Sequence, residues 1–318
     1  MKIKMKGKES PSTCKTCAKS SSCSSKPASG ECKDAKSAEK DAKTQQQDAR
    51  ISSTLSRIKY KLFVMSGKGG VGKSSITVNL AAALARKGHK VGILDVDLHG
   101  PSVPRMLGLS GNLEGNAQGE VSPKACGENL YVVSMESLLK DPDQAVLWRG
   151  PMKTSAIRQF IGEIQWGELD YLVIDSPPGT GDEHMTVLRT IPDALCVVVT
   201  TPQEVSLADV RKAINFLQYA QANILGIVEN MSGLICPHCS KEIALFKKGG
   251  GEELAKKYGI EFLGAVPLDP ITVVAGDVGK PVVLMDEPSP VKDALMALAD
   301  TIDNAAQSSL EAHATTRR

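Results

Sequence analysis

From Tyr60 onward, short runs of apolar residues alternate with longer segments in which apolar residues recur at helical spacing. Short, uniformly apolar runs are typical of strands that are buried on both faces. Their alternation with helices is typical of a mainly parallel sheet covered by helices on both faces, an α/β fold. The pattern predicts strands at KLFVMS, KVGILDVD, LYVVSM, YLVIDSPP, ALCVVVTTP, ILGIVENM and FLGAVP.

The intervening segments predict the helices. One follows the first strand and ends at Gly88, because glycine is favoured just past a helix C-terminus. The same apolar spacing predicts helices over residues 153–163, 182–190, 205–221, 251–258 and 290–306. We therefore expect one domain over residues 57–306, a flexible tail over 1–56 and a flexible C-terminal tail over 307–318.

The N-terminal tail differs in composition from the rest of the chain. Residues 1–48 contain eleven lysines and six acidic residues, many serines and alanines, and no aromatic residue. Such a segment cannot bury enough apolar surface to offset the entropy that ordering costs. We expect it to be a disordered tether that carries a cluster of cysteines.

Composition excludes several classes of function. No apolar run is long enough to span a membrane, and the N-terminus lacks the apolar stretch of a secretory signal, so a cytoplasmic location is expected. A formal net charge of +2 over 318 residues does not indicate a nucleic-acid partner. The eight cysteines then indicate metal or redox chemistry rather than disulfides, because a reducing compartment disfavours disulfides.

The segment VMSGKGGVGKSSI lies between the first strand and the first helix and satisfies the phosphate-loop pattern through Gly67, Gly72, Lys73 and Ser74. Glycines let successive backbone N–H groups point at phosphate oxygens, and the helix N-terminus adds a positive end. Lys73 supplies a point charge and the Ser74 hydroxyl can bind Mg²⁺. The other residues expected to line this nucleotide site are Lys68, Gly69, Gly70, Val71 and Ser75.

Three aspartates end the neighbouring strands. Asp95 and Asp97 close KVGILDVD, and Asp175 closes YLVID. Function in such sheets lies at the carboxyl ends of the strands, so these acids are expected beside the phosphate loop. An aspartate in the position of Asp175 is the usual second Mg²⁺ anchor and holds the ion through water.

The second lysine of the loop carries a resemblance. GKGGVGKSS resembles the deviant phosphate loop of the MinD/ParA/ArsA-type ATPases, in which the early lysine is a signature. This resemblance implies that Lys68 reaches across a homodimer and neutralises phosphate charge in the partner's site. A cation supplied in this way acts as an arginine finger does and makes hydrolysis depend on dimerisation.

Further motifs resemble a narrower group within these ATPases. DVDLHGPSVPRMLGL, IDSPPGTGDEH, VVTTPQEVSLADVRKAI, GIVENMS, CPHC and LGAVPLDP together look like the Mrp/ApbC-type iron–sulfur cluster carriers. The resemblance implies an eight-stranded, mainly parallel MinD-like sheet. It also implies that Asp97 orients the attacking water, that Asp175 is the Mg²⁺-side acid, and that Asn230 and Pro267 form the adenine pocket.

CPHC places Cys236 and Cys239 as a two-residue-spaced thiolate pair, which can hold half of a metal site. A tetrahedral zinc or a cubane cluster needs four ligands. We therefore expect a homodimer in which each chain contributes the pair. In the resembled family such a pair holds a labile 4Fe-4S cluster at the dimer interface.

A second set of cysteines lies in the tail. Cys14, Cys17 and Cys23 have the spacing C-x2-C-x5-C, which resembles the later part of the N-terminal cluster motif of eukaryotic cytosolic family members. Those members have a fourth cysteine upstream, whereas here Cys32 lies downstream and could replace it. The sequence leaves open whether this set binds a second cluster or zinc.

The function that these features predict is that of an ATP-binding, slowly hydrolysing carrier. It receives a 4Fe-4S cluster from a scaffold protein and transfers it to apo-proteins, with ATP and Mg²⁺ as cofactors. One alternative is a MinD/ParA-type positioning ATPase, although the chain shows no amphipathic membrane-seeking C-terminal helix and no dense basic run. Another is a reductase like the nitrogenase iron protein, whose cluster cysteines lie singly rather than as a C-x2-C pair.

Overall fold

The computed structural model describes residues 33–98, 100–113, 115–116, 120–138, 150–236, 239 and 241–316. The chain divides into two compact units, Met1–Ala49 and Arg50–Arg318. Most of helix α1 (Lys33–Leu55) belongs to the first unit, and its last turns belong to the second. Everything else described here lies in the second unit.

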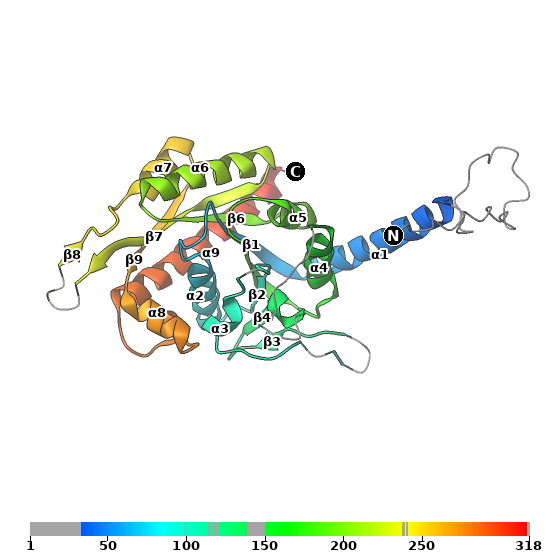
Figure 1. The fold of residues 1–318 in the computed structure, drawn as a ribbon, viewed down its shortest axis with the longest axis horizontal. Coiled ribbons are helices and arrows are strands. Elements are labelled where there is room, and N and C mark those ends of the chain that lie inside the picture. The colour runs from blue at the N-terminus through cyan, green and yellow to red at the C-terminus, as the bar shows by residue number, and fades with distance from the viewer. Residues whose placement is uncertain are drawn as a thin grey trace, which may run out of the picture. The chain divides into compact units, whose positions relative to one another are not determined.

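The second unit is built on a nine-stranded sheet with the order β3-β4-β2-β5-β1-β6-β7-β8, in which β9 also pairs with β7 (Figure 1). The pairs among β4, β2, β5, β1, β6, β7 and β9 are parallel, whereas β3 and β8 pair antiparallel with β4 and β7. The strands are β1 (Ile58–Ser66), β2 (Val91–Asp95), β3 (Lys124–Ala125), β4 (Leu130–Ser134), β5 (Leu169–Asp175), β6 (Leu195–Thr200), β7 (Asn223–Ile235), β8 (Glu242–Ile243) and β9 (Phe262–Leu268).

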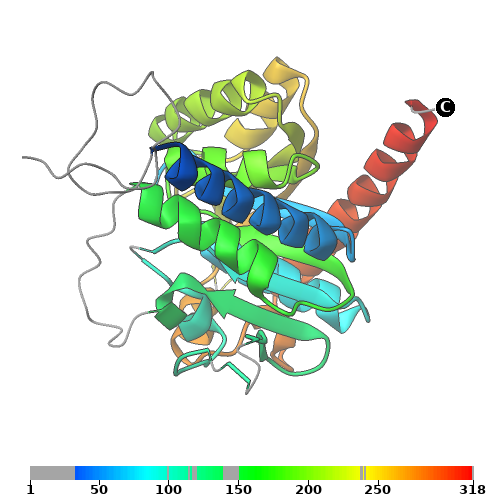
Figure 2. The same ribbon diagram turned by 90° about the vertical axis from the view of Figure 1, so that its right-hand side faces the viewer.

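Helices cover both faces of this sheet and enclose two hydrophobic cores (Figures 1 and 2). One core joins the sheet to α2 (Lys73–Arg86), α3 (Val103–Met106), α8 (Pro270–Asp277), η2 (Val282–Leu284) and α9 (Pro290–Thr316). The other joins it to α4 (Gly150–Glu163), α5 (Asp182–Thr190), α6 (Glu204–Tyr219) and α7 (Gly250–Tyr258). A short 3₁₀ helix, η1 (Met135–Leu138), follows β4.

Strand β7 runs beyond the sheet. Its first part pairs with β6 and β9, and its last residues pair with β8, Leu234 opposite Ile243. Met231 has φ 57° and Gly233 has φ 77°, so the backbone is irregular at the register shift between Asn230 and Leu234 in the pairing with β9. The result is a hairpin that projects from the sheet (Figure 1).

All seven strands and all six helices that the sequence predicts are present, and the α/β fold with a mainly parallel sheet is confirmed. The sheet has nine strands rather than eight, because β3 and β8 are two-residue edge strands without an apolar pattern. Helices α3 and α8 were not predicted, since proline lies in the first turn of each and their apolar residues do not form a stripe.

The expected limits of the tails differ from the structure. Residues 33–55 form a helix, and Ile51 and Thr54 at its end are 5 % and 4 % exposed. Ile51 lies against Gly162 of α4, where an added Cβ would come within 2.7 Å of it, so the domain begins near Arg50 rather than at residue 57. At the other end α9 continues to Thr316, through residues such as alanine and glutamine that favour helix. Within the described residues, no helix combines the length and the apolar character that crossing a lipid bilayer requires.

Candidate nucleotide site and cysteine hairpin

The phosphate loop connects β1 to α2 and is shaped by close packing. At Gly67 an added Cβ would lie 2.4 Å from the backbone of Asp209 in α6, so only glycine fits there. Gly72 has φ 80°, and its added Cβ would lie 2.2 Å from the Asn230 amide nitrogen. The loop therefore takes one compact path that ends on the N-terminus of α2, where backbone N–H groups can bind phosphate.

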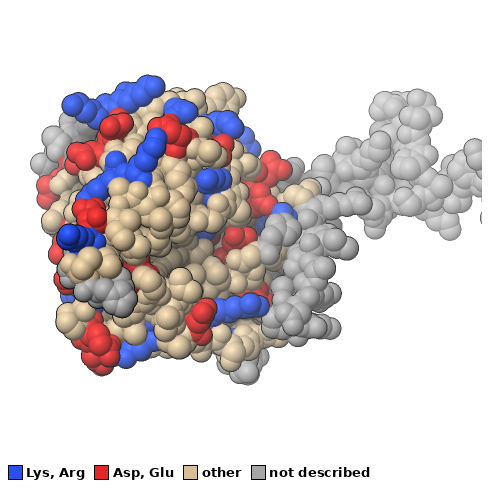
Figure 3. All heavy atoms as spheres, turned by 60° about the vertical axis from the view of Figure 1, so that its left-hand side comes forward, with Lys and Arg blue, Asp and Glu red and all other residues tan. Residues whose placement is uncertain are grey.

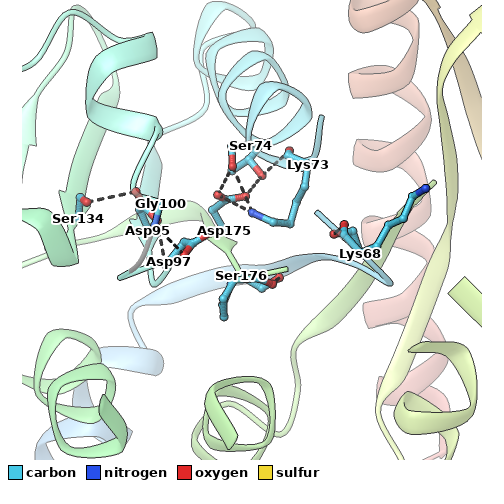
Figure 4. Close-up of polar contacts among 12 residues, drawn as sticks. Lys68, Lys73, Ser74, Asp95, Asp97, Gly100, Ser134, Asp175 and Ser176 are labelled. Atoms are coloured by element: carbon cyan, nitrogen blue, oxygen red, sulfur yellow. Dashed lines mark hydrogen bonds and ion pairs between the residues drawn. The ribbon is translucent and has the colours of Figure 1, made fainter. Parts of the chain in front are cut away.

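Asp175, at the end of β5, is the centre of a buried polar cluster in this loop (Figure 4). Its Oδ2 lies 2.8 Å from Lys73 Nζ and accepts a hydrogen bond from Ser74 Oγ at 2.6 Å. Its Oδ1 accepts one from Thr77 Oγ1 at 2.6 Å. The carboxylate thus lies beside the hydroxyl expected to bind Mg²⁺, as an acid that holds the ion through water requires.

Asp95 and Asp97 have different environments. Asp95 is fully buried opposite Asp175 in the β2–β5 pairing, and burial together with the Asp175 charge raises the pKa of Asp95 well above its usual value. Its oxygens accept hydrogen bonds from the Asp97 backbone N–H at 3.0 Å and the Ser134 hydroxyl at 3.1 Å. Asp95 therefore holds the turn that presents Asp97, which is the acid better placed to meet a substrate.

Asp97 lines a cavity of about 360 Å³ together with Pro177, Pro178, Thr180 and His184. His184 is 1 % exposed, and its ring packs edge-on to Phe63 and Phe216. Burial lowers the pKa of His184 to about 4, so the ring is neutral at physiological pH. The cavity is large enough to hold water molecules beside Asp97.

A second pocket of about 370 Å³ opens beside Gly72 and Ser75. Asn230 and Pro267 line it, and Met231 and Val266 add apolar surface. The Asn230 amide donates to the Val71 carbonyl oxygen at 2.8 Å. A mainly apolar pocket with a few polar side chains, next to a phosphate loop, suits a nucleotide base.

Lys68 takes no part in the Asp175 cluster. Figure 4 shows its side chain pointing away from Lys73 and Asp175, while its backbone oxygen accepts a hydrogen bond from Ser66 Oγ at 2.9 Å. The structure thus separates the two lysines of the loop, one turned into its own site and one turned outward. Gly69 and Gly70 between them are exposed.

Cys236 and Cys239 lie at the tip of the β7–β8 hairpin. The Cys236 backbone N–H donates to the Lys241 carbonyl oxygen at 3.0 Å, which closes the hairpin at the first cysteine. Cys236 is half-buried and Cys239 is exposed. Within the described residues no group of three or more His, Cys, Asp or Glu could hold a metal ion, so the pair offers two ligands of the four that a cluster needs.

The remaining cysteines have other environments. Cys196 is fully buried in β6, where burial raises the pKa of its thiol to about 12, and Cys126 is half-buried near Leu107. Both have the environment of structural residues. The tail cysteines Cys14, Cys17, Cys23 and Cys32 lie outside the described residues.

The predicted site residues did not include Thr77 and His184, which the structure brings into the nucleotide site, or Glu229, a buried carboxylate of β7 outside that site. Thr77 follows Lys73 by four residues and so shares its helix face, a signal that was present in the sequence. His184 and Glu229 carried no such signal, because a histidine early in a helix and a glutamate in a strand are ordinary on a surface. Their burial is visible only in the fold.

Comparison with known proteins agrees with this geometry. The family model described as the NUBPL iron-transfer P-loop NTPase matches residues 57–303. The chain is 49 % identical over 233 residues to the iron-sulfur cluster carrier protein of Methanocaldococcus jannaschii, covering 73 % of this chain and 80 % of that protein. It is 47 % identical over 253 residues to the human cytosolic Fe-S cluster assembly factor NUBP2, covering 78 % and 93 %.

Solved structures agree as well. A nucleotide-binding protein from Archaeoglobus fulgidus in complex with ADP superposes with a TM-score of 0.67 at 40 % identity, covering 78 % of this chain and 96 % of that one. The cell division ATPase MinD of Pyrococcus furiosus superposes with a TM-score of 0.58 at 24 % identity, covering 78 % and 99 %. The second likeness confirms the MinD-like fold expected from the sequence.

Proposed function

The chain belongs to the NUBPL iron-transfer P-loop NTPase family, and we propose from this that it is an ATP-dependent carrier of iron–sulfur clusters. The observation that carries the proposal is the hairpin that holds Cys236 and Cys239 at an accessible tip, on the same strand that reaches the base pocket at Asn230. The printed names of the relatives, a cluster carrier and a cluster assembly factor, support the same function.

ATP binds with its base between Asn230 and the Pro267 turn and its phosphates against the N–H groups of the loop. Lys73 would then exchange Asp175 for the phosphates, and Ser74 and Asp175 are the residues that would hold Mg²⁺, Asp175 through water. Mg²⁺, when bound, neutralises charge on the β- and γ-phosphates.

Asp97 orients a water molecule from the adjoining cavity toward the γ-phosphorus. The bond from phosphorus to the bridging oxygen breaks as the bond to the water oxygen forms, and ADP leaves with the bridging oxygen. The water's protons pass to the phosphate product. We expect turnover to be slow without the partner's Lys68, because a cation supplied in trans stabilises charge on the transferring phosphoryl group.

The active form is a homodimer in which each chain supplies two thiolates to one cluster. The hairpin and the residues just after it present Ile235, Ile243 and Leu245, which are 36 %, 44 % and 52 % exposed. Three exposed valines lie in α8 and directly after it: Val273, Val274 and Val278. The face that includes the hairpin and α8 is largely uncharged around a hollow, with charged side chains at its margin (Figure 3). A second copy of this chain covers such a surface and completes the cluster site at once.

The cluster is cargo. We propose that it is a 4Fe-4S cluster, received from a scaffold protein and passed to apo-proteins, because exposed ligands at a hairpin tip permit exchange of thiolates. A cytosolic location is supported by the name of the human relative. The tail cysteines Cys14, Cys17, Cys23 and Cys32 are candidates for a second site of this kind.

Anaerobic reconstitution with iron and sulfide tests the proposal. We expect about four iron atoms per dimer, the stoichiometry of one shared cubane, with Mössbauer parameters of a 4Fe-4S cluster and transfer to an apo-aconitase. The proposal would be contradicted if the protein stayed monomeric and iron-free after reconstitution, or if a dimer held the iron elsewhere than at Cys236 and Cys239.

A further inference from the structure

Glu229 is a fully buried carboxylate in β7 that neither the phosphate loop nor the thiolate pair uses. Its Oε1 accepts hydrogen bonds from Ser232 Oγ at 2.6 Å and from the Gly249 backbone N–H at 2.9 Å. Its Oε2 accepts one from the Gly251 backbone N–H at 2.6 Å. Three donors on one buried carboxylate make a strong, charge-assisted set of bonds.

These donors lie at the two ends of residues 233–248, the segment that carries the cysteine hairpin. Ser232 lies in β7, three residues before the strand ends, and Gly249 directly precedes α7. Residues 233–248, with Cys236 and Cys239 at their tip, therefore form a loop whose two ends are bound to a single side chain. Gly249 and Gly251 also open α7, so the helix N-terminus adds its positive end to the carboxylate.

The residue next to Glu229 reaches the nucleotide site. Side chains of consecutive strand residues point to opposite faces, so Glu229 faces α7 and Asn230 faces the phosphate loop. The Asn230 amide is bound to the Val71 carbonyl and also lines the base pocket. Met231 then takes φ 57°, a strained conformation for a large side chain, in the same pocket wall.

We propose that Glu229 is a positioning residue that transmits nucleotide occupancy to the cysteine hairpin. A base in the pocket competes with the Val71 carbonyl for the Asn230 amide and shifts this part of β7. The shift moves Glu229, and with it both ends of the hairpin segment. As a result, the thiols of Cys236 and Cys239 change their exposure to solvent. The inference rests on the proposed nucleotide and cluster functions. It connects the nucleotide pocket to the cysteine hairpin through β7.

The test uses the cluster-free, reduced full-length chain, so that it reads the hairpin directly and not cluster transfer. Cys239 is labelled with a pulse of N-ethylmaleimide, with and without saturating Mg-ADP, and quantified by peptide mass spectrometry. We expect Mg-ADP to change the labelling rate of Cys239 by about fivefold or more in the wild type, the low end of allosteric couplings. Cys126, half-buried and far along the chain from the hairpin, is the internal reference.

Glu229→Gln removes the negative charge at nearly constant size and turns an amide N–H₂ toward the donors. We expect Mg-ADP affinity by calorimetry to stay within about threefold while the Mg-ADP effect on Cys239 labelling falls to nearly none. Ser232→Ala deletes a single donor, is compatible with folding, and should reduce the effect partly. Glu242→Gln is the matched control, because Glu242 is an exposed hairpin carboxylate paired with Lys248 at 2.6 Å.

Three results would overturn the inference. They are a wild type whose Cys239 labelling ignores bound Mg-ADP, a Glu229→Gln chain that binds Mg-ADP and keeps the full effect, and a Glu242→Gln control that loses it equally. If Glu229→Gln does not fold, an undiminished effect in Ser232→Ala overturns it as well. Failure of iron binding would bear on the carrier function and leave this test unaffected, because no iron is present.

Discussion

The ammonium group of Lys73 lies 2.8 Å from Asp175 Oδ2, and the two side chains are 6 % and 1 % exposed. A lysine expected to bind phosphate is thus paired with the acid expected to sit beside Mg²⁺. Breaking a buried pair costs energy unless a new partner replaces the old one. Nucleotide with Mg²⁺ supplies both replacements together, phosphate for Lys73 and a hydrated cation for Asp175.

Asp175→Asn should therefore weaken the binding of Mg²⁺ without weakening the binding of the nucleotide itself. We expect the affinity for Mg²⁺ in the ternary complex to fall about 10- to 100-fold, the usual loss when a group that orients a metal ligand is changed. ADP without Mg²⁺ should bind at least as well as to the wild type, because Lys73 loses a competing partner. Calorimetry with and without Mg²⁺ measures both. Asp193→Asn, which removes the exposed partner of Lys61, is the control, and equal losses with and without Mg²⁺ would contradict the assignment.

Cys236→Ala and Cys239→Ala should each abolish the shared cluster and leave nucleotide binding nearly intact. The hairpin tip supplies the thiolates, and the phosphate loop is held by separate contacts through Gly67 and Asp175. Iron analysis after reconstitution and calorimetry with Mg-ADP measure the two properties. Cys126→Ala should keep its iron. Full iron content in the Cys236→Ala, Cys239→Ala double variant would show that the cluster lies elsewhere.

The parts of the fold that the sequence predicted are those with a strong local signal. The strand of Asp175 is a continuous apolar run, and the loop at Lys73 has a spacing imposed by phosphate geometry. The hairpin that carries Cys236 was not predicted, because β8 has two residues and its pairing depends on distant contacts. Likewise the burial of Glu229 follows from where α7 packs, which no local pattern encodes.

The end of α1 is a second place where a local pattern did not predict burial. Ile51 was assigned to the tail, because its neighbours are polar and one apolar residue gives no periodicity. We expect a chain that starts at Arg50 to unfold at nearly the same temperature as the whole protein, since it keeps the second unit entire. A loss of more than a few degrees would show that residues 1–49 stabilise the domain.

Ile51→Ala should destabilise the protein by about 2 to 5 kcal/mol, the range for truncating a buried aliphatic side chain. The side chain is 5 % exposed and lies against Gly162, so its removal leaves a cavity. Urea denaturation of the full chain measures the change. Ser52→Ala, an exposed neighbour, should be within about 0.5 kcal/mol of the wild type. Equal stability of Ile51→Ala and Ser52→Ala would mean that the packing is absent in solution.

His184 predicts a loss of stability in acid. Burial lowers its pKa to about 4, below the ordinary value of 6.5 that applies when the chain is unfolded. Between these values the unfolded chain binds the proton and the folded chain does not, so stability falls as the pH drops through 6.5 toward 4. From pH 7 to pH 5 this group alone should cost about 2 kcal/mol.

His184→Phe keeps an aromatic ring between Phe63 and Phe216 and removes the titrating group. We expect the dependence of unfolding free energy on pH between 7 and 5 to weaken by that amount. His89→Gln is the control, at a half-buried histidine bound to Asp303. It tests whether removing any histidine weakens the pH dependence of the unfolding free energy equally. An unchanged slope in His184→Phe would mean that the ring is hydrated and titrates normally.

Lys68 points away from its own Asp175 cluster, and this orientation favours action in a partner's site. Lys68→Ala should leave nucleotide affinity within about tenfold, because Lys73 and the backbone N–H groups remain, yet lower hydrolysis by about 10³-fold, the scale of a lost cationic finger. Lys73→Ala should instead weaken binding itself. Single-turnover measurement with saturating ATP and Mg²⁺ separates the two effects even when turnover is slow.

Mixing two inactive chains tests the direction of action. An Asp97→Asn chain keeps Lys68, and a Lys68→Ala chain keeps Asp97, so a hybrid dimer contains one composite site with both groups intact. We expect hydrolysis to return to about a quarter of the wild-type rate in an equal mixture, since half of the random dimers are hybrids and each has one complete site of two. Mixing either variant with itself supplies the control. If hybrids form, as native mass spectrometry would show, and hydrolysis stays at the level of the parents, Lys68 does not act across the dimer.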